Sequence, residues 1–211
     1  MNAELRESKS STLKHKTLNK RYAKCIFGVI CSAVLITGCG RQPITPKPMG
    51  YFRITLPEKA YTSYQSECGF RFEYPVYAKV VKDERPNAEP CWLDIEFPAL
   101  KATVHCSYKT GADEMNQFVE DSRSLAYKHT VKADAIEETY IKDSVRNVYG
   151  VLYDIKGNAA SSIQFFLTDS TDKFVRGALY FNAVPNKDSL APVIAFVHED
   201  IEQLIKTFSW K

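Results

Sequence analysis

The sequence predicts an α+β fold: an antiparallel β-sheet in two blocks, with a mid-chain helix and a long C-terminal helix packed on it. Short segments alternate between apolar and polar residues, which is typical of half-buried strands. Two longer segments instead repeat apolar residues at helical spacing, one in the middle of the chain and one near its end. A helix after each block of strands favours an α+β arrangement.

The first block of strands precedes the mid-chain helix. Phe70–Tyr74 alternates strictly and is expected to pair with the segment 78–82. The segments 91–97 and 101–108 alternate again and are joined by a short turn, which predicts a hairpin. Residues 51–56 are predicted to form a further strand.

The remaining elements are two helices and a second block of strands. Residues 113–129 are predicted to be helical, with Asp113 as the N-cap. The four strand segments that follow are separated by turn-forming residues and cover 135–142, 147–155, 162–168 and 174–182. The final helix follows residues 186–188, and its apolar positions are Leu190, Val193, Ile194, Val197, Ile201, Leu204, Ile205 and Phe208.

The first 38 residues have the layout of an export signal. A basic region ends at Lys24, and residues 25–36 form an apolar stretch of about 12 residues, roughly 18 Å as a helix and shorter than the ~30 Å bilayer core. Ile36-Thr37-Gly38-Cys39 then resembles the lipobox of bacterial lipoproteins. We therefore expect a lipoprotein signal peptide over 1–38, with Cys39 as the lipid attachment site that carries a diacylglyceryl group and acyl chains such as palmitate.

Residues 39–50 follow as the lipidated Cys and a tether with three prolines, which favours an extended spacer. Residues 51–211 are predicted to form a single globular α+β domain. Several acyl chains would anchor the domain stably to a membrane, because one chain alone holds only marginally.

The net charge of +3 belongs to the signal and not to the domain. Residues 1–38 hold seven of the 28 basic and two of the 25 acidic residues, which leaves 21 basic and 23 acidic residues and a net charge of −2. A nearly neutral domain lacks the basic field that nucleic acid or an anionic membrane would select. No nucleic acid partner is expected.

Three cysteines remain after the signal and Cys39, in a compartment that favours disulfides. We expect Cys68 to pair with Cys91, because both sit at predicted strand starts, after polar loops. The bridge would close a loop of about 24 residues, worth roughly 3 kcal/mol. Cys106 lies on an apolar strand face and is predicted to be a buried free thiol. The absence of CxxC and HxxxH spacing argues against a metal site.

The sequence contains none of the common catalytic motifs, and we predict no catalytic residue, no cofactor and no enzymatic activity. Ser161 follows a glycine-containing turn and could be a nucleophile, but a hairpin turn with small residues explains it better. Asp94 and Glu96 share a strand face near Lys101, which is typical of an exposed, charge-balanced face. Trp92 lies on that same face, where it could pack beneath the first helix or contact a partner.

The four histidines are distant from one another in the sequence, and the three that follow the signal segment each have a simple structural explanation. His105 is expected to be solvated on a polar strand face, and His198 lies off the apolar stripe of the last helix. His129 ends the first helix, where a cation would be favoured by the helix dipole.

Residues 38–211 resemble one family along almost their whole length. The stretches that carry the resemblance are Gly38-Cys39-Gly40, Pro46-Lys47-Pro48, Tyr51-Phe52-Arg53, Glu67-Cys68-Gly69-Phe70-Arg71-Phe72-Glu73-Tyr74, Cys91-Trp92-Leu93-Asp94-Ile95-Glu96-Phe97-Pro98, Lys132-Ala133-Asp134-Ala135-Ile136-Glu137-Glu138, Gly157-Asn158-Ala159-Ala160-Ser161, Gln164-Phe165, Thr168-Asp169-Ser170, Arg176-Gly177-Ala178-Leu179-Tyr180-Phe181 and Trp210-Lys211. In this order and spacing they resemble the gliding motility lipoprotein GldD family of the Bacteroidetes.

This resemblance implies a periplasm-facing lipoprotein, in the inner or outer membrane, that is required for gliding and for the linked type IX secretion machinery. Its implied partners are other gliding motility lipoproteins and membrane proteins, and its implied role is structural rather than chemical. It also implies the Cys68–Cys91 pairing. Residues 40–43 lack the acidic residues that direct lipoproteins of this phylum to the cell surface.

Two further expectations remain open beside this one. The pattern of elements is similar to the PsbP/Mog1-like sandwich, a likeness of fold that carries no function. A periplasmic small-ligand-binding module is the alternative function, and it predicts an apolar pocket between sheet and helix with a few convergent polar groups. The sequence itself points to no small-molecule substrate.

Overall fold

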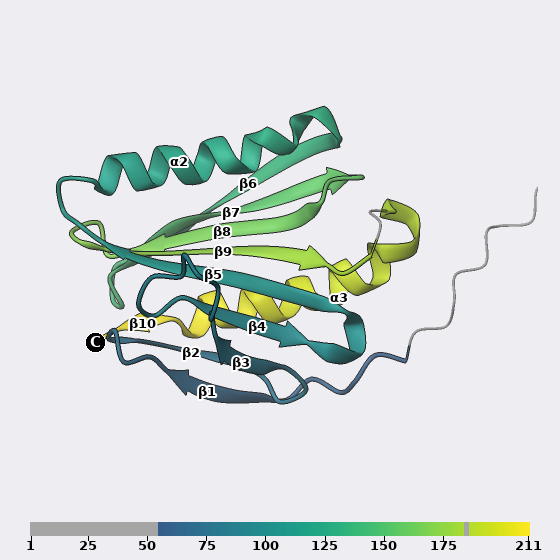
Figure 1. Ribbon diagram of the computed structural model, residues 1–211, viewed down its shortest axis with the longest axis horizontal. Helices are drawn as coiled ribbons and strands as arrows, with labels where there is room; N and C mark the ends of the chain where they lie inside the picture. Colours follow the sequence, from purple (N-terminus) through teal and green to yellow (C-terminus); the bar gives the residue numbers. More distant parts are fainter. Residues whose placement is uncertain (1–54, 184–185) are drawn as a thin grey trace, which may run out of the picture. The chain divides into compact units, whose positions relative to one another are not determined.

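The computed structural model describes residues 55–183 and 186–211, which form two antiparallel sheets and two α-helices (Figure 1). The strands are β1 (Tyr61–Gln65), β2 (Phe70–Pro75), β3 (Lys79–Lys82), β4 (Leu93–Phe97), β5 (Ala102–Thr110), β6 (Ala133–Asp143), β7 (Val148–Gly157), β8 (Ser161–Thr168), β9 (Lys173–Phe181) and β10 (Ser209–Trp210). The helices are α2 (Met115–Tyr127) and α3 (Lys187–Thr207), with short 3₁₀ turns η1 (Pro98–Leu100) and η2 (Lys128–Val131). The predicted α+β class with two blocks of antiparallel strands is confirmed.

The larger sheet has seven strands in the order β3-β4-β5-β9-β8-β7-β6, and the smaller has three in the order β1-β2-β10. All pairs are antiparallel. The helix α3 and the small sheet pack on one side of the large sheet, which we call the inner face. The helix α2 lies on the opposite side, the outer face (Figure 1).

Strict alternation in the strands fills the inner face with apolar side chains. Alternate residues of β4, β5, β8 and β9 point inward and meet the stripe of α3 that the sequence predicts. Phe165 and Phe208 are among the largest fully buried side chains of this core. Gly177 is required opposite Phe165, because a Cβ at Gly177 would lie 2.3 Å from the Phe165 ring.

The outer face has a smaller core under α2, formed by residues of β7, β8 and β9 with Ala126 of the helix. The hydrophobic cluster beneath α2 draws on β6 to β9 but includes no residue of β3, β4 or β5. Those strands instead present Asp94, Glu96, Thr103 and His105 at alternate positions, none of them in either core.

A buried polar cluster joins the start of the described chain to α3. The Asp200 carboxylate is 2% exposed and accepts hydrogen bonds from Lys59 Nζ at 2.6 Å, Tyr61 Oη at 3.0 Å and Tyr77 Oη at 2.7 Å. The Lys59 ammonium also donates to the Phe196 carbonyl and lies 3.6 Å from the centre of the Phe196 ring. Burial and hydrogen bonding to Asp200 raise the pKa of Tyr61 to about 12.

Three expectations about individual elements were wrong, and one strand was missed. β3 pairs with β4 and not with β2, whose neighbours are β1 and β10. Glu114, and not Asp113, is the N-cap of α2, and it makes no side-chain capping bond. β1 was not predicted. Of the strand expected over 51–56, residues 55 and 56 are not in a strand, and 51–54 lie outside the described residues.

Candidate functional site

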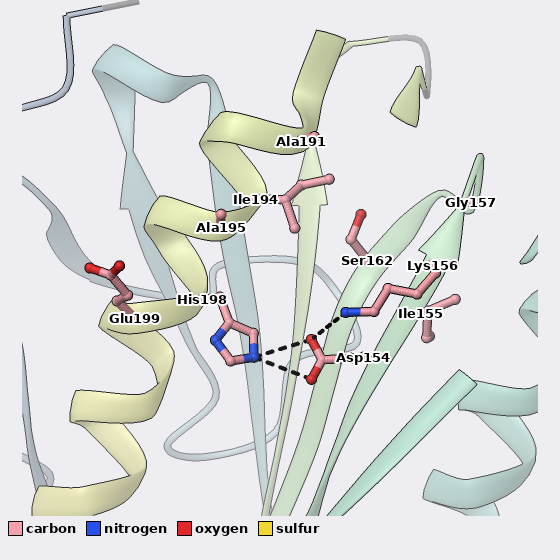
Figure 2. A pocket seen from close by; sticks show the side chains of 10 residues that line it. All are labelled: Asp154, Ile155, Lys156, Gly157, Ser162, Ala191, Ile194, Ala195, His198 and Glu199. Carbon is pink, nitrogen blue, oxygen red and sulfur yellow. Dashed lines mark hydrogen bonds and ion pairs between the residues drawn. The ribbon is translucent and has the colours of Figure 1, made fainter. Parts of the chain in front are cut away.

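A concave site lies between the N-terminal half of α3 and the adjoining ends of β7 and β8 (Figure 2). It has a volume of about 470 Å³, and we call it the α3 pocket. Alternate residues of β7 turn Asp154 and Lys156 toward the helix, while α3 presents His198 one turn after Ile194. The lining residues are Asp154, Ile155, Lys156, Gly157, Ser162, Ala191, Ile194, Ala195, His198 and Glu199.

Asp154 is the polar centre of this pocket. Its carboxylate oxygens lie 3.1 and 3.2 Å from His198 Nε2, and Lys156 Nζ lies 4.0 Å away on the other side (Figure 2). The hydrogen bond with Asp154 raises the pKa of His198, and this exceeds the opposing effect of burial. The pocket therefore joins apolar walls to a carboxylate that lies between a histidine and a lysine.

Ser161, the candidate nucleophile from the sequence, is not placed to act as one. Ser161 is fully buried, and its hydroxyl donates to the Ile163 carbonyl at 3.3 Å. No histidine or acidic group is a hydrogen-bond partner of Ser161 within the described part of the chain. The hypothesis that Ser161 is a catalytic nucleophile therefore fails on geometry. His198 uses Nε2 for Asp154, and its Nδ1 lies 4.0 Å from Glu202.

The polar residues expected on the strand face near Trp92 form a second cluster. Asp94 accepts from His105 Nδ1 at 2.7 Å and lies 3.8 Å from Arg85, so its partners are these residues and not Lys101. His105 is consequently a hydrogen-bond partner of Asp94 and not simply a solvated side chain. Trp92 is half-buried, and its indole N–H donates to the Tyr108 carbonyl at 3.1 Å.

His129 also differs from the expectation. It lies in η2 just after α2, where a protonated side chain would suit the helix dipole. Burial and the nearby Arg176 guanidinium instead lower the pKa of His129. Burial therefore dominates the environment of His129, and the positive charge of Arg176 acts in the same direction.

The cysteines divide into a bridged pair and a free thiol. A disulfide joins Cys68 to Cys91, whose Cα atoms lie 6.2 Å apart, and so ties the start of β2 to the start of β4. Cys106 is free and buried, as predicted, and burial raises the pKa of its thiol to about 12. Cys39 and the tether lie outside the described residues.

Within 55–183 and 186–211, no three His, Cys, Asp or Glu side chains come together in a way that could hold a metal ion. No helix in those ranges has the length and apolar character needed to cross a membrane.

Sequence reasoning missed Asp154 and Lys156 as site residues. The signal was present, because alternation along β7 places both on the face that carries the buried Leu152. Polar residues on a face that is otherwise covered by a helix mark an edge of the core or a pocket. Locating His198 opposite them requires the packing of α3, which is 44 residues away from Asp154 in the sequence.

The fold and its pockets define a mixed α+β domain with two antiparallel sheets and concave sites that hold no catalytic arrangement among the described residues. The family model of the gliding motility lipoprotein GldD matches residues 41–210. The chain belongs to this family, and the predicted membership is confirmed. As a member of a lipoprotein family, it is a membrane-anchored protein of the gliding motility system.

The other two comparisons give no information about function. No curated protein matches the chain. Among solved structures, the solution structure of cyanobacterial PsbP (CyanoP) from Synechocystis sp. PCC 6803 is similar, with 12% identity and a TM-score of 0.43 over 74% of this chain and 95% of that chain. At this identity and TM-score, the likeness carries nothing about function.

Proposed function

We propose that the protein is a non-enzymatic structural or accessory component of the gliding motility and type IX secretion machinery, anchored through Cys39 and facing the periplasm. The family match over residues 41–210 carries this proposal, because it spans the tether and the whole domain. Residues 1–38 act as the signal peptide, and 39–50 hold the domain away from the membrane. The partners are other gliding motility lipoproteins and membrane proteins.

The edge of the large sheet supports a role in assembly. β6 is the last strand of that sheet and runs for 11 residues, so one side of its backbone has no neighbouring strand in the described chain. Long exposed edges are sites where another chain can add a strand. Tyr140 on β6 is 76% exposed, and Val145 in the following turn is 96% exposed. Large apolar side chains beside an open edge suit a protein partner.

A deletion strain tests this role. Loss of the protein is expected to abolish colony spreading and to reduce type IX secretion, and the wild-type gene is expected to restore both. Cys39→Ala is expected to restore neither, because the domain would leave its membrane. Normal spreading and secretion in the deletion strain would contradict the proposal.

The α3 pocket favours a second candidate, a periplasmic small-ligand-binding module. Apolar walls of Ile194 and Ala195 beside an Asp154–His198 pair are the composition such sites use. Ala195→Trp would fill this pocket from the helix, and Ala195→Ser is the matched control. If the accessory role is correct, both variants should support spreading. Loss of spreading with Ala195→Trp alone, in a folded protein, would favour ligand binding.

A further inference from the structure

The part of the outer face that α2 leaves open contains a pocket of about 380 Å³, which we call the Arg176 pocket. It is formed by neighbouring strands β5 and β9, with Arg85 and Trp92 closing one side. The lining residues are Arg85, Trp92, His105, Cys106, Ser107, Arg176, Ala178 and Tyr180. It lies on the opposite side of the sheet from the α3 pocket and shares no residue with it.

Arg176 is the unusual group in this pocket. Its Nη2 donates to Gln164 Oε1 at 2.5 Å, and no carboxylate lies within ion-pair distance of it among the described residues. The Arg176 side chain is half-buried, and this burial lowers the pKa of Arg176 because the cation loses part of its hydration. A partly buried guanidinium without an anionic partner is costly unless another group compensates it.

The two acidic side chains nearby are engaged elsewhere. Asp83 is buried and bound by Arg85, whose guanidinium lowers the pKa of Asp83 to about 2. Asp94 is bound by His105 at 2.7 Å. Neither carboxylate is therefore available as an ion-pair partner for Arg176.

The hydrogen-bond partner of Arg176 is itself incompletely satisfied. Gln164 is 1% exposed, and its Oε1 accepts from Arg176, yet its Nε2 has no hydrogen-bond partner in the described structure. Buried polar groups are normally satisfied, so a single bond to this neutral amide leaves the guanidinium without a charged partner. Gln164 does not line the pocket, and an anion bound there would compensate the Arg176 guanidinium.

The remaining walls define what the anion is attached to. Trp92 and Tyr180 provide aromatic surface, and the Tyr180 ring lies 5.6 Å from the His105 ring. Ser107 adds one hydroxyl. Asp94 lies in the same cluster and would repel a doubly charged group, so a single negative charge fits better than a phosphate dianion.

We propose that the Arg176 pocket binds a small organic carboxylate, with the planar Arg176 guanidinium holding the carboxylate and the Trp92 and Tyr180 rings contacting its apolar part. The site is separate from the proposed assembly role, and neither depends on the other.

Sodium benzoate is the probe, because it joins one carboxylate to one ring, and benzamide is its uncharged counterpart. The chain has two tryptophans, so the indole N–H signals of Trp92 and Trp210 can be followed separately by ¹H–¹⁵N NMR. Trp210 lies on β10 and serves as the internal control. Millimolar benzoate is expected to shift Trp92 and not Trp210, and benzamide is expected to shift neither.

Variants assign the effect to the guanidinium. Arg176→Gln is expected to weaken benzoate binding by about tenfold or more, the size of a lost charged hydrogen bond, and Arg176→Lys by less. Arg123→Gln removes an exposed arginine from α2 and should leave binding unchanged. Ser107→Ile is the substitute if Arg176→Gln fails to fold. It keeps the guanidinium but narrows the pocket directly opposite Arg176 on β5, and it should also weaken binding.

The proposal is overturned if benzoate leaves Trp92 unshifted, or if Arg176→Gln and Arg123→Gln bind it equally well. Inorganic phosphate is the third probe. Binding of phosphate more tightly than benzoate would overturn the assignment to a carboxylate.

Discussion

The inner face of the large sheet is covered by α3 and the small sheet, whereas α2 covers only part of the outer face. The inner face holds a large apolar core, with the α3 pocket at its rim. The outer face combines a small core with the Arg176 pocket and an ion-pair cluster around Asp94. The same strands build both faces by alternation, so the difference comes from what packs on each. Stability should therefore depend mainly on inner residues, and recognition on outer ones.

The strongest test of this comparison replaces one buried ring on each face. Phe165→Ala removes a 1% exposed ring from the inner core and is expected to lower the free energy of unfolding by about 3–5 kcal/mol. Phe118→Ala removes a half-buried ring from α2 on the outer face and is expected to cost roughly half as much. Urea denaturation of both variants measures the difference. Equal losses would show that the two cores contribute alike.

The Asp200 cluster predicts the next largest effect. Asp200→Ala leaves Lys59 and two tyrosine hydroxyls without their shared acceptor and is expected to cost about 3 kcal/mol. Tyr61→Phe removes one donor and leaves the others, and it should cost about 1 kcal/mol. Thermal unfolding measures both. A cost for Asp200→Ala no larger than that for Tyr61→Phe would mean that the cluster does not hold α3.

The Cys68–Cys91 disulfide predicts a loss of about 2–4 kcal/mol when both cysteines are replaced by serine. The bridge ties the small sheet to the large one on the inner side, so the loss should appear in global unfolding. Reduction of the wild-type protein should give a similar loss, and reduction of Cys106→Ala serves as the control for the free thiol. No change in stability on reduction would contradict a structural role.

The His198–Asp154 pair predicts the smallest effect, and it depends on pH. The pKa of His198 is raised in the folded state, so its stabilising contribution is complete below the ordinary value of 6.5 and is lost as the pH rises through the folded pKa. The difference in unfolding free energy between the wild type and His198→Gln should therefore be larger at about pH 5 than at about pH 9. A difference that grows with pH would contradict the assigned pair.

The sequence could predict most elements, because alternation and helical spacing are local properties. β4, β5, β7, β8, β9 and α3 were all predicted near their observed bounds. β1 was missed because Tyr61–Gln65 has no regular apolar alternation and is largely exposed. The partner of β3 was wrong because proximity along the chain favours β2, whereas β2 is occupied by β1 and β10.

The pockets could not be predicted, because their residues meet only through sheet register and helix packing. Gln164 and Arg176 become neighbours through the β8–β9 pairing, in which Arg176 lies opposite Phe166. Asp154 meets His198 across 44 residues of sequence. The sequence pattern identifies each of these residues only as polar, and polar residues are also typical of a solvated face.

The central claim is that the protein works as an anchored component of an assembly, and affinity capture from membranes tests it most directly. We expect the tagged, lipidated protein to retain other gliding motility lipoproteins and membrane proteins. Tyr140→Ser combined with Val145→Glu on the open sheet edge is expected to lose them. Val76→Glu, at a 57% exposed position outside that edge, should retain them. Capture of the protein alone, from membranes in which the candidate partners are present, would contradict the claim.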